Sequence, residues 1–536
     1  AALDAPERPR TRALCFQGGG ILSLASFASV TAGLMHVHAA KQGIAKATLS
    51  GGLYESIGLL SSVSGGSWLV ASMAYSEKDF LPLVEAMARE PTSAREIFQE
   101  GWVKKWLNIG EPHNKWDQFV KDSAMKLRMG RFWRTFAEFS FVRKKGDHWS
   151  DFVQAVLGIA NIKPDLPLGA PVAPWARGKV WLVDHSLMAG ARNYQVTLHQ
   201  SFGYSVKYHV EGVPNASLPL YIPAKFSVTL GAGLDEAAPF PYMAASAAAK
   251  VSHSQYVKGV IFKRRVRVNS KKWDPAFPEF TRPAGRFTVV DASSASSAAL
   301  GGTALEPSFN FLNNFVRASL VPWMSNNALG GSAFAAGNSL VTGLSRSANR
   351  AVSGLEVLAA SQLHGAIDGG YTDDTSIAQA IASGANEVVA FLHNKTNVDP
   401  FVNLFSGGKR SIEKGGVPRL FFPIFAEDAA YAQAEVDALA RLVLPPNADG
   451  RPCLEGIAIG TIKATTAASE WFGIEAGRMV TIKVVAVTSS LGIGFFEDFS
   501  DYAALAQEII GTLILPQNGP EVKGHLVDFL LRSPQQ

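Results

Sequence analysis

The chain has 536 residues, of which 47% are apolar and 18% are charged, and its net charge is +5 at pH 7. This balance supplies a large hydrophobic core, and it excludes disordered, collagenous and coiled-coil proteins. With two cysteines, Cys15 and Cys453, the chain is not a disulfide scaffold and has no cysteine-based zinc site. It contains no run of about eighteen apolar residues and no hydrophobic signal core. We therefore expect a soluble protein without a transmembrane segment, in a compartment that the sequence leaves open.

The first 75 residues predict a strand, a glycine-containing turn and a helix, twice in succession. Residues 13–17 form a short apolar strand that ends at Gly18-Gly19-Gly20, and an apolar helix follows over 22–40. A second apolar strand over 57–62 leads into a Ser/Gly turn and a helix that ends near residue 75. This order is typical of a wound α/β layer.

The rest of the chain alternates between a helical region and further strands. Residues 76–175 are charged and rich in tryptophan, and their composition predicts a helical insertion. Residues 283–350 are rich in Ala, Ser and Gly, with an apolar patch over 309–323. The expected strands are 180–188, 221–230 and 260–268, interpreted as an antiparallel extension, and 388–392, 420–425 and 479–487.

Basic and aromatic residues gather in the predicted insertion. Residues 101–150 hold eleven Lys/Arg against five Asp/Glu, and a second basic block covers 258–272. Basic residues between aromatic ones suit an anionic membrane surface, so we expect peripheral membrane contact. The alternative is a solvated basic face over a Trp-containing core. No nucleic acid partner is expected, because no recognition motif accompanies the basic blocks. The tryptophans of this region are Trp102, Trp106, Trp116, Trp133, Trp149 and Trp175.

The segment Ser62-Val63-Ser64-Gly65-Gly66 has the pattern of a nucleophilic serine on a tight strand-to-helix turn. Such a turn needs small residues two positions before and two positions after the nucleophile, and Ser62 and Gly66 meet that need. The helix that follows directs its N-terminal dipole at the serine, which favours developing negative charge. A plain Ser/Gly loop is the alternative.

Two other segments could contribute to such a site. Consecutive glycines after a strand, as at Gly18-Gly19-Gly20, let backbone N–H groups converge on an oxyanion, although they also suit a phosphate or a simple turn. The Walker and dinucleotide patterns do not fit, because no Gly-Lys-Ser/Thr follows and Ser23 occupies the last glycine position. Asp368-Gly369-Gly370 ends an apolar stretch and is either an exposed acid at a strand end or a turn.

Together, the triple glycine, the serine turn and the distant Asp-Gly-Gly resemble the patatin and group IV cytosolic phospholipase A2 superfamily. Ser64-Gly65-Gly66-Ser67-Trp68 is more similar to the cytosolic phospholipase A2 and lysophospholipase branch, and Asp-Gly-Gly to patatin. The resemblance implies a three-layer α/β/α fold with a central, mostly parallel sheet. It also implies one catalytic domain over 13–536, preceded by a polar arm over 1–12 and carrying 76–175 as a helical insertion or cap.

The same resemblance implies a lipid acyl hydrolase of the phospholipase A or lysophospholipase type. Catalysis would use a Ser–Asp dyad, with Ser64 as the nucleophile and Asp368 as its general base, and with no cofactor or metal. The implied oxyanion hole consists of Gly18, Gly19, Gly20 and Gly65. In the family an arginine usually stands two residues after the triple glycine, whereas this chain has Leu22. This departure predicts a neutral headgroup on the substrate or reduced activity.

Two other classes of protein remain as alternatives. A conventional α/β-hydrolase esterase would use the chain order Ser64, Asp368, His525, with Gly18–Gly20 as its oxyanion loop. A catalytically impaired lipid-binding protein on the same fold would explain Leu22. A metal site lacks support, because the eleven histidines are scattered along the chain.

Overall fold

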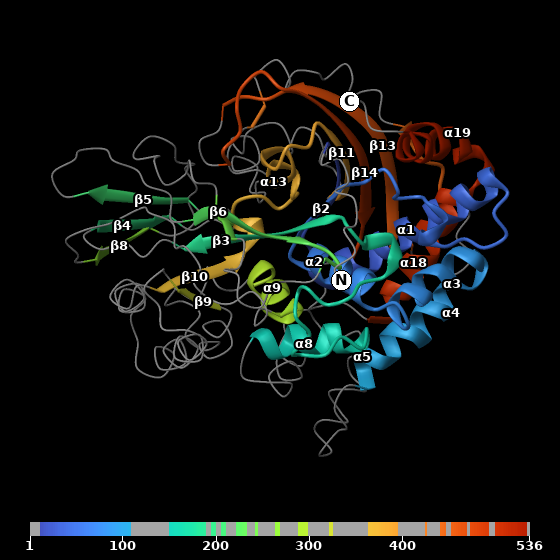
Figure 1. The fold of residues 1–536 in the computed structure, drawn as a ribbon, viewed down its shortest axis with the longest axis horizontal. Coiled ribbons are helices and arrows are strands. Elements are labelled where there is room, and N and C mark those ends of the chain that lie inside the picture. Colours follow the sequence, from blue (N-terminus) through green and yellow to red (C-terminus); the bar gives the residue numbers. More distant parts are fainter. Residues whose placement is uncertain are drawn as a thin grey trace.

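A computed structural model describes residues 11–108, 149–188, 194–199, 205–210, 221–232, 242–244, 263–268, 288–298, 321–324, 363–394, 424–425, 440–445, 452–468, 472–491 and 499–532 (Figure 1). Its helices are α1 (Gly20–Gln42), α2 (Gly65–Tyr75), α3 (Phe80–Arg89), α4 (Ala94–Phe98), α5 (Lys104–Asn108), α8 (Trp149–Ile159), α9 (Val289–Ser296), α13 (Ile377–Ala382), α18 (Phe499–Ile514), α19 (Gly519–Glu521) and α20 (Asp528–Leu531). Shorter 3-10 and π turns are η1 (Leu49–Gly51), η2 (Pro91–Ser93), η3 (Gln99–Val103), η4 (Pro174–Ala176), η9 (Gly369–Tyr371), η10 (Pro516–Asn518) and η11 (Val522–Val527).

The strands of the described residues form one large mixed sheet and one small sheet. The centre of the large sheet is parallel, in the order β14, β11, β1, β2, β3, and antiparallel strands extend it on both sides. The central strands are β1 (Arg12–Phe16), β2 (Leu59–Val63), β3 (Val180–Met188), β11 (Glu387–Asn394) and β14 (Met479–Ser489). The flanking strands are β6 (Tyr221–Thr229), β7 (Tyr242–Ala244), β9 (Val321–Met324), β10 (Leu363–Asp368), β12 (Ala440–Arg441) and β13 (Leu454–Thr465). The small antiparallel sheet contains β4 (Tyr194–His199), β5 (Ser205–Val210) and β8 (Lys263–Val268).

Helices cover both faces of the parallel centre. On β1, Phe16 packs against Phe27 of α1 with ring centroids 6.3 Å apart, whereas the neighbouring Cys15 donates to the Ser376 carbonyl at the start of α13. Because successive side chains of a strand point to opposite faces, α1 and α13 lie in different layers. Helix α18 packs along α1 (Figure 1). The predicted three-layer α/β/α architecture with a parallel central sheet is confirmed.

The described part of the predicted insertion is helical and joins the main core. Trp102 and Trp106 are 1% exposed and stack on each other at 6.0 Å. Trp106 also contacts Phe152 of α8 and Phe499 of α18 at 5.6 and 5.9 Å. Trp175 is buried as well. These three tryptophans are therefore core residues, as the alternative interpretation of the region predicted.

One helix among the described residues, α1, is long and apolar enough to cross a membrane. Its most apolar window is 89% buried inside the protein, against α2, α3, α18 and the sheet. This burial is what the central helix of an α/β layer requires. The expectation of no transmembrane segment rested on runs of consecutive apolar residues, and α1 passes only the test of length and mean hydropathy, which a buried core helix also passes.

The local predictions near the N-terminus agree with the structure to within a few residues. The strand predicted over 180–188 is β3, but it is parallel to β2 and antiparallel to β6, so it belongs to the sheet centre and not only to an antiparallel extension. The strand over 260–268 is β8 of the small sheet. Residues 1–10, most of the patch over 309–323 and most of the basic stretch 101–150 lie outside the described residues.

Candidate active site

Two strands meet end to end on the same edge of β3. Along this edge Val63, the last residue of β2, pairs with Asp184 in a parallel register. The next residue of β3, His185, pairs with Asp368, the last residue of β10, in an antiparallel register. The opposite edge of β3 is filled by β6. Ser64 and Asp368 are 304 positions apart in the sequence, and this register brings them together.

Ser64 occupies a strained turn between β2 and α2. Its backbone has φ 53° and ψ −126°, an unusual conformation for a residue with a side chain, and such strain costs about 1–3 kcal/mol. The turn is tight because a Cβ atom on Gly66 would lie 2.5 Å from the Phe16 carbonyl oxygen, and one on Gly65 would overlap the Gly20 backbone. Glycine is therefore required at both positions, and the turn has the geometry that the sequence predicted.

Asp368 is almost completely buried, and the Ser64 hydroxyl lies close enough to its carboxyl group to lower its pKa as a hydrogen-bond donor. Its Oδ1 atom also accepts from the Gly370 N–H at 2.8 Å. Burial, with a smaller contribution from the nearby Asp374, raises the pKa of Asp368 to about 7, whereas Gly370 and Ser64 oppose the shift. Because an ionised carboxylate only accepts, the Ser64 hydroxyl is the donor, which is the arrangement that a base and its nucleophile need.

The triple glycine lies beside this pair. Gly19 and Gly20 have positive φ values of 145° and 59°, and helix α1 begins at Gly20. A Cβ atom on Gly18 would lie 3.0 Å from the Ser64 Cβ atom. The backbones of Gly20 and Gly65 touch, so the first turns of α1 and α2 start side by side. The first N–H groups of a helix have no partner within it, so Gly19, Gly20 and Gly65 can supply donors near Ser64.

Gly18 differs from the other three predicted oxyanion donors. Its N–H donates to the main-chain oxygen of Asp374 at 3.0 Å and is therefore already used in this structure. The expectation that Gly18 supplies an oxyanion donor is corrected on this ground. What Gly18 contributes is the absence of a side chain, which lets Ser64 and Asp374 approach the loop closely.

Three further residues of this region carry no motif in the sequence. Gln17 donates from Nε2 to Asp374 Oδ2 at 2.7 Å, and its Oε1 accepts a hydrogen bond from the main-chain N–H of His393 at 2.6 Å. His393, in β11, contacts Ser23 of α1 at 3.1 Å behind the triple glycine.

The clue in the sequence was the proximity of Gln17 to the glycines and of Asp374 to Asp368. Their pairing depends on strands that are distant in the chain.

A buried polar cluster lies on the opposite face of the sheet, next to α13. Asp184 Oδ2 accepts from Ser376 and Ser61 at 2.6 and 3.1 Å, and burial raises its pKa well above the ordinary value. Burial likewise raises the pKa of Asp373 to about 6 and lowers that of Lys225 to about 8. Among the described residues, no group of three or more His, Cys, Asp or Glu side chains could hold a metal ion.

The histidine of the alternative triad lies away from this site. His525 is 46% exposed and pairs with Glu521 at 3.0 Å in η11, which continues into α20. The segment after it is fixed to the start of β1, because the Arg12 guanidinium donates to the Phe529 carbonyl at 3.1 Å. Ser64 follows the end of β2, which runs parallel to β1. His525 thus belongs to the opposite end of the parallel strands from Ser64, and the Ser64–Asp368–His525 triad is wrong.

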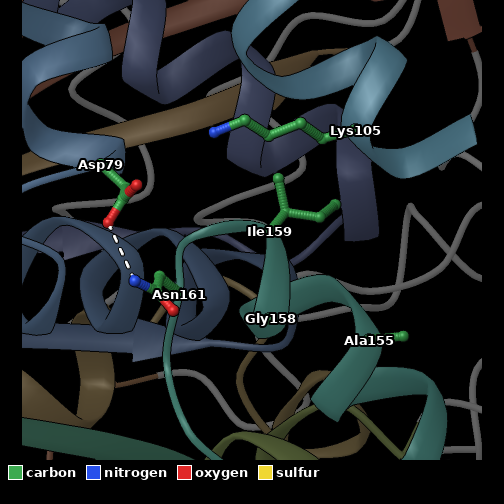
Figure 2. A pocket seen from close by; sticks show the side chains of 6 residues that line it. All are labelled: Asp79, Lys105, Ala155, Gly158, Ile159 and Asn161. Carbon is green, nitrogen blue, oxygen red and sulfur yellow. Dashed lines mark hydrogen bonds between the residues drawn. The ribbon is translucent and has the colours of Figure 1, made fainter. Parts of the chain in front are cut away.

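A surface pocket of about 460 Å³ lies between α3, α5 and α8 (Figure 2). Its polar walls include Asp79, which accepts from Asn161 Nδ2 at 3.4 Å, and Lys105. The described lining contains none of the predicted site residues and no nucleophile paired with a base. This pocket is separate from the Ser64 site.

Neither a protein-family model nor a curated protein matches the chain. Among solved structures the chain is similar to human GIVD cytosolic phospholipase A2, with a TM-score of 0.34 and 12% sequence identity. The match covers 98% of this chain and 64% of the phospholipase, so the chain spans less than two thirds of that structure. A similarity at this level does not define a fold, and the α/β class rests on the strand order and helix layers above.

Proposed function

We propose that this protein is a serine hydrolase that cleaves fatty-acyl esters of glycerolipids through a dyad of Ser64 and Asp368. The observation that carries this proposal is the placement of a strained, glycine-framed serine next to a buried carboxylate, whose pKa the serine hydroxyl lowers, beside two helix N-termini. Nucleophile, base and oxyanion donors are the three parts that acyl transfer requires.

The first half of the reaction forms an acyl-enzyme. Ser64 Oγ attacks the ester carbonyl carbon while Asp368 takes the hydroxyl proton. The carbonyl oxygen becomes an oxyanion, and the N–H groups of Gly19, Gly20 and Gly65 are its expected donors. When the tetrahedral intermediate collapses, the bond to the leaving alkoxide breaks and Asp368 returns the proton to that oxygen.

The second half repeats these roles with water. Asp368 takes a proton from a water molecule, whose oxygen attacks the acyl carbon, and the Ser64 oxygen then leaves and recovers the proton. A base works best when its pKa is near the working pH. The pKa of Asp368, raised to about 7 by burial, meets this condition.

The lipid substrate rests on the resemblance of the glycine, serine and Asp-Gly-Gly segments to the patatin and group IV cytosolic phospholipase A2 superfamily, nearer the phospholipase branch at the serine. Leu22, where the family usually has arginine, is buried in α1 and offers no cation for a phosphate. The absence of this cation favours an ester with a neutral headgroup. Peripheral contact with an anionic membrane would then depend on the basic residues of 101–150, since Trp102 and Trp106 are in the core.

The proposal is tested by labelling the protein with an alkyl fluorophosphonate and mapping the modified residue by mass spectrometry. We expect modification at Ser64, and we expect Ser64→Ala to lose labelling and at least about 1,000-fold of esterase activity. Ser294→Ala is the matched control, because Ser294 is also buried but its hydroxyl has no hydrogen-bond partner among the described residues. A parent protein that binds lipid vesicles but is neither labelled nor active would be the lipid-binding alternative.

A further inference from the structure

We infer that Ser296 is a positioning residue for this site, and that residues 296–298 form a strap that holds the nucleophile and the base at their working separation. The inference rests on the proposed function, because it assigns Ser296 a role in orienting Ser64. Ser296 lies in the Ala/Ser/Gly-rich region whose sequence showed no periodic pattern.

The strap contacts both catalytic strands through the backbone. The Ser64 N–H donates to the Ser296 carbonyl at 3.1 Å and also to the Ser296 hydroxyl at 3.0 Å. Two residues further on, the Ala298 carbonyl accepts from the Asp368 N–H at 3.3 Å. One tripeptide therefore spans the junction where β2 and β10 meet end to end.

The Ser296 hydroxyl is fully used by these contacts. It donates to the Asp184 carbonyl at 2.5 Å, and it lies 2.9 Å from the Ser67 hydroxyl. A hydroxyl has one proton and two lone pairs, so Ser296 must accept from both Ser64 and Ser67. Ser296 is completely buried, so water does not compete for these positions.

The same counting fixes the direction of a longer chain of hydrogen bonds. Because Ser67 donates to Ser296, Ser67 must accept from Ser62, whose oxygen lies 3.0 Å away. Ser62 in turn accepts from the Trp181 indole, which can only donate, at 2.8 Å. The chain runs from an obligate donor on β3 through three hydroxyl groups to an obligate acceptor, the Asp184 carbonyl, also on β3. Each hydrogen bond in this chain can therefore run in one direction only. The strained turn at Ser64 lies between Ser62 and Ser67, which are both members of the chain.

The position of the strap is fixed by its own helix. Thr288 and Asp291 form a reciprocal capping box at the start of α9, with bonds of 3.0 and 3.1 Å. At the other end, Ser297 accepts from the Trp68 indole of α2 at 3.0 Å. Since α9 is held at both ends, Ser296 cannot follow Ser64 if the turn relaxes.

Strain at Ser64 persists only if its surroundings enforce it. The N–H of Ser64 is the group that a relaxed turn would rotate, and Ser296 holds that group with two acceptors. A displacement of about 1 Å at the nucleophile can cost about 100-fold in rate. We therefore expect the strap to act on the reactivity of Ser64 more than on substrate binding.

The test is Ser296→Ala in the full chain, with Ser294→Ala as the matched control. Ser294 lies in the same helix and is equally buried, but its hydroxyl has no hydrogen-bond partner among the described residues. The readouts are the rate constant for fluorophosphonate labelling at Ser64 and the separate kcat and KM values for a short soluble ester. Circular dichroism and the thermal midpoint report folding for each variant.

We expect Ser296→Ala to reduce the labelling rate and kcat by about 10- to 100-fold, with KM within about twofold of the parent. Ser294→Ala should match the parent, and Ser296→Thr, which keeps the hydroxyl, should recover part of the rate. If Ser296→Ala does not fold, Ser67→Ala replaces it in the test. This variant removes the donor to the Ser296 hydroxyl oxygen, and we expect it to show a smaller loss of the labelling rate and of kcat.

The outcomes separate the two proposals. If the parent is labelled at Ser64 and the folded Ser296→Ala variant reacts at the same rate, the strap is refuted while the hydrolase assignment stands. An equal loss in Ser294→Ala would also refute it, because the effect would then be one of helix packing. A parent that does not react at Ser64 refutes the proposed function and the strap together.

Discussion

Gly18 and Ser64 are in such close contact that a Cβ atom added to Gly18 would lie 3.0 Å from the Ser64 Cβ atom. The same added atom would lie 2.6 Å from Asp374 Oδ1. A side chain at this position would therefore press on the nucleophile and on the neighbouring acid at once. The triple glycine is explained here by the space beside Ser64, in addition to the backbone geometry of Gly19 and Gly20.

We expect Gly18→Ala to reduce kcat for a soluble ester by about 10- to 100-fold, because the methyl group displaces Ser64 or Asp374. The measurement is steady-state kinetics on protein whose folding is checked by circular dichroism. Gly158→Ala in α8 is the control, since nothing lies within 4 Å of its added Cβ atom. A Gly18→Ala enzyme with parental kcat would show that the loop shifts at no cost.

The dependence of activity on pH should reveal the base. Asp368 must be ionised to accept the Ser64 proton, so kcat/KM should rise with pH and level off above about 7, the raised pKa of Asp368. Asp374 contributes to that raised value as a like charge. In Asp374→Asn the pKa of Asp368 should fall and the rising limb should move to lower pH. An unchanged limb would mean that another group controls the rate.

The structure explains why the sequence predicted some parts of this site and not others. The turn at Ser64 and the glycines before α1 are local patterns, each written within a few residues, so both were predicted in place. The pairing of Asp368 with Ser64 depends on the register of β10 against β3, which no local pattern encodes. From the residues alone Asp368 was only a strand end or a turn, and its role came from the family resemblance.

The residues that were missed act through long-range contacts. Ser296 is one serine in a serine-rich stretch, and its importance comes from where α9 places it. Gly18 was assigned a role that its N–H cannot fill, because that N–H already donates to the Asp374 carbonyl. The sequence could not reveal this bond, since the two residues are 356 positions apart. The strand β13 alternates between buried and less buried residues, so its period of two was visible and could have been predicted.

The buried base should also cost stability at neutral pH. Its pKa is about 7 in the folded chain and about 3.9 in the unfolded chain, so between these values the folded state binds more protons. The stability that Asp368 contributes is thus fully present below pH about 4 and is lost as pH rises through about 7.

Asp368→Asn should therefore be inactive yet more stable than the parent at pH 8, by an amount on the order of a few kcal/mol at most. The difference should shrink at pH 5, where the parent carboxyl is protonated. Thermal or denaturant unfolding at the two pH values measures this. A variant less stable than the parent at pH 8 would argue against a desolvated carboxylate at this position.

Membrane contact stays a prediction that depends on charge. Basic side chains near an anionic surface contribute about 1 kcal/mol each and are screened by salt. Replacing four basic residues of the stretch by Gln should weaken binding to anionic vesicles and spare hydrolysis of a short soluble ester. Binding that is unaffected by the replacement would identify the stretch as a solvated face. The four residues are Arg131, Arg134, Lys144 and Lys145.

Arg12 should be essential for stability and irrelevant to chemistry. It is almost completely buried at the start of β1, with its Nη2 atom 2.6 Å from Glu387 Oε2. It also donates to the Phe529 and Arg532 carbonyls at 3.1 and 2.6 Å, which fastens the C-terminal helices to the start of β1, at the end of the parallel strands opposite Ser64. Removing one partner of a buried ion pair leaves the other charge uncompensated, at a cost of about 3–5 kcal/mol.

Arg12→Met should therefore lower the free energy of unfolding by about 3–5 kcal/mol in a denaturant titration. The labelling rate of Ser64 in the folded variant should equal that of the parent, because the ion pair lies at the start of the parallel strands and the nucleophile at their end. Lys41→Met is the control: Lys41 pairs with Asp528 on the same helices, but both side chains are partly exposed. An exposed pair contributes about 0–1 kcal/mol. Equal losses in the two variants would contradict this prediction, because they would mean that burial adds no stability to the Arg12 ion pair beyond that of an exposed pair.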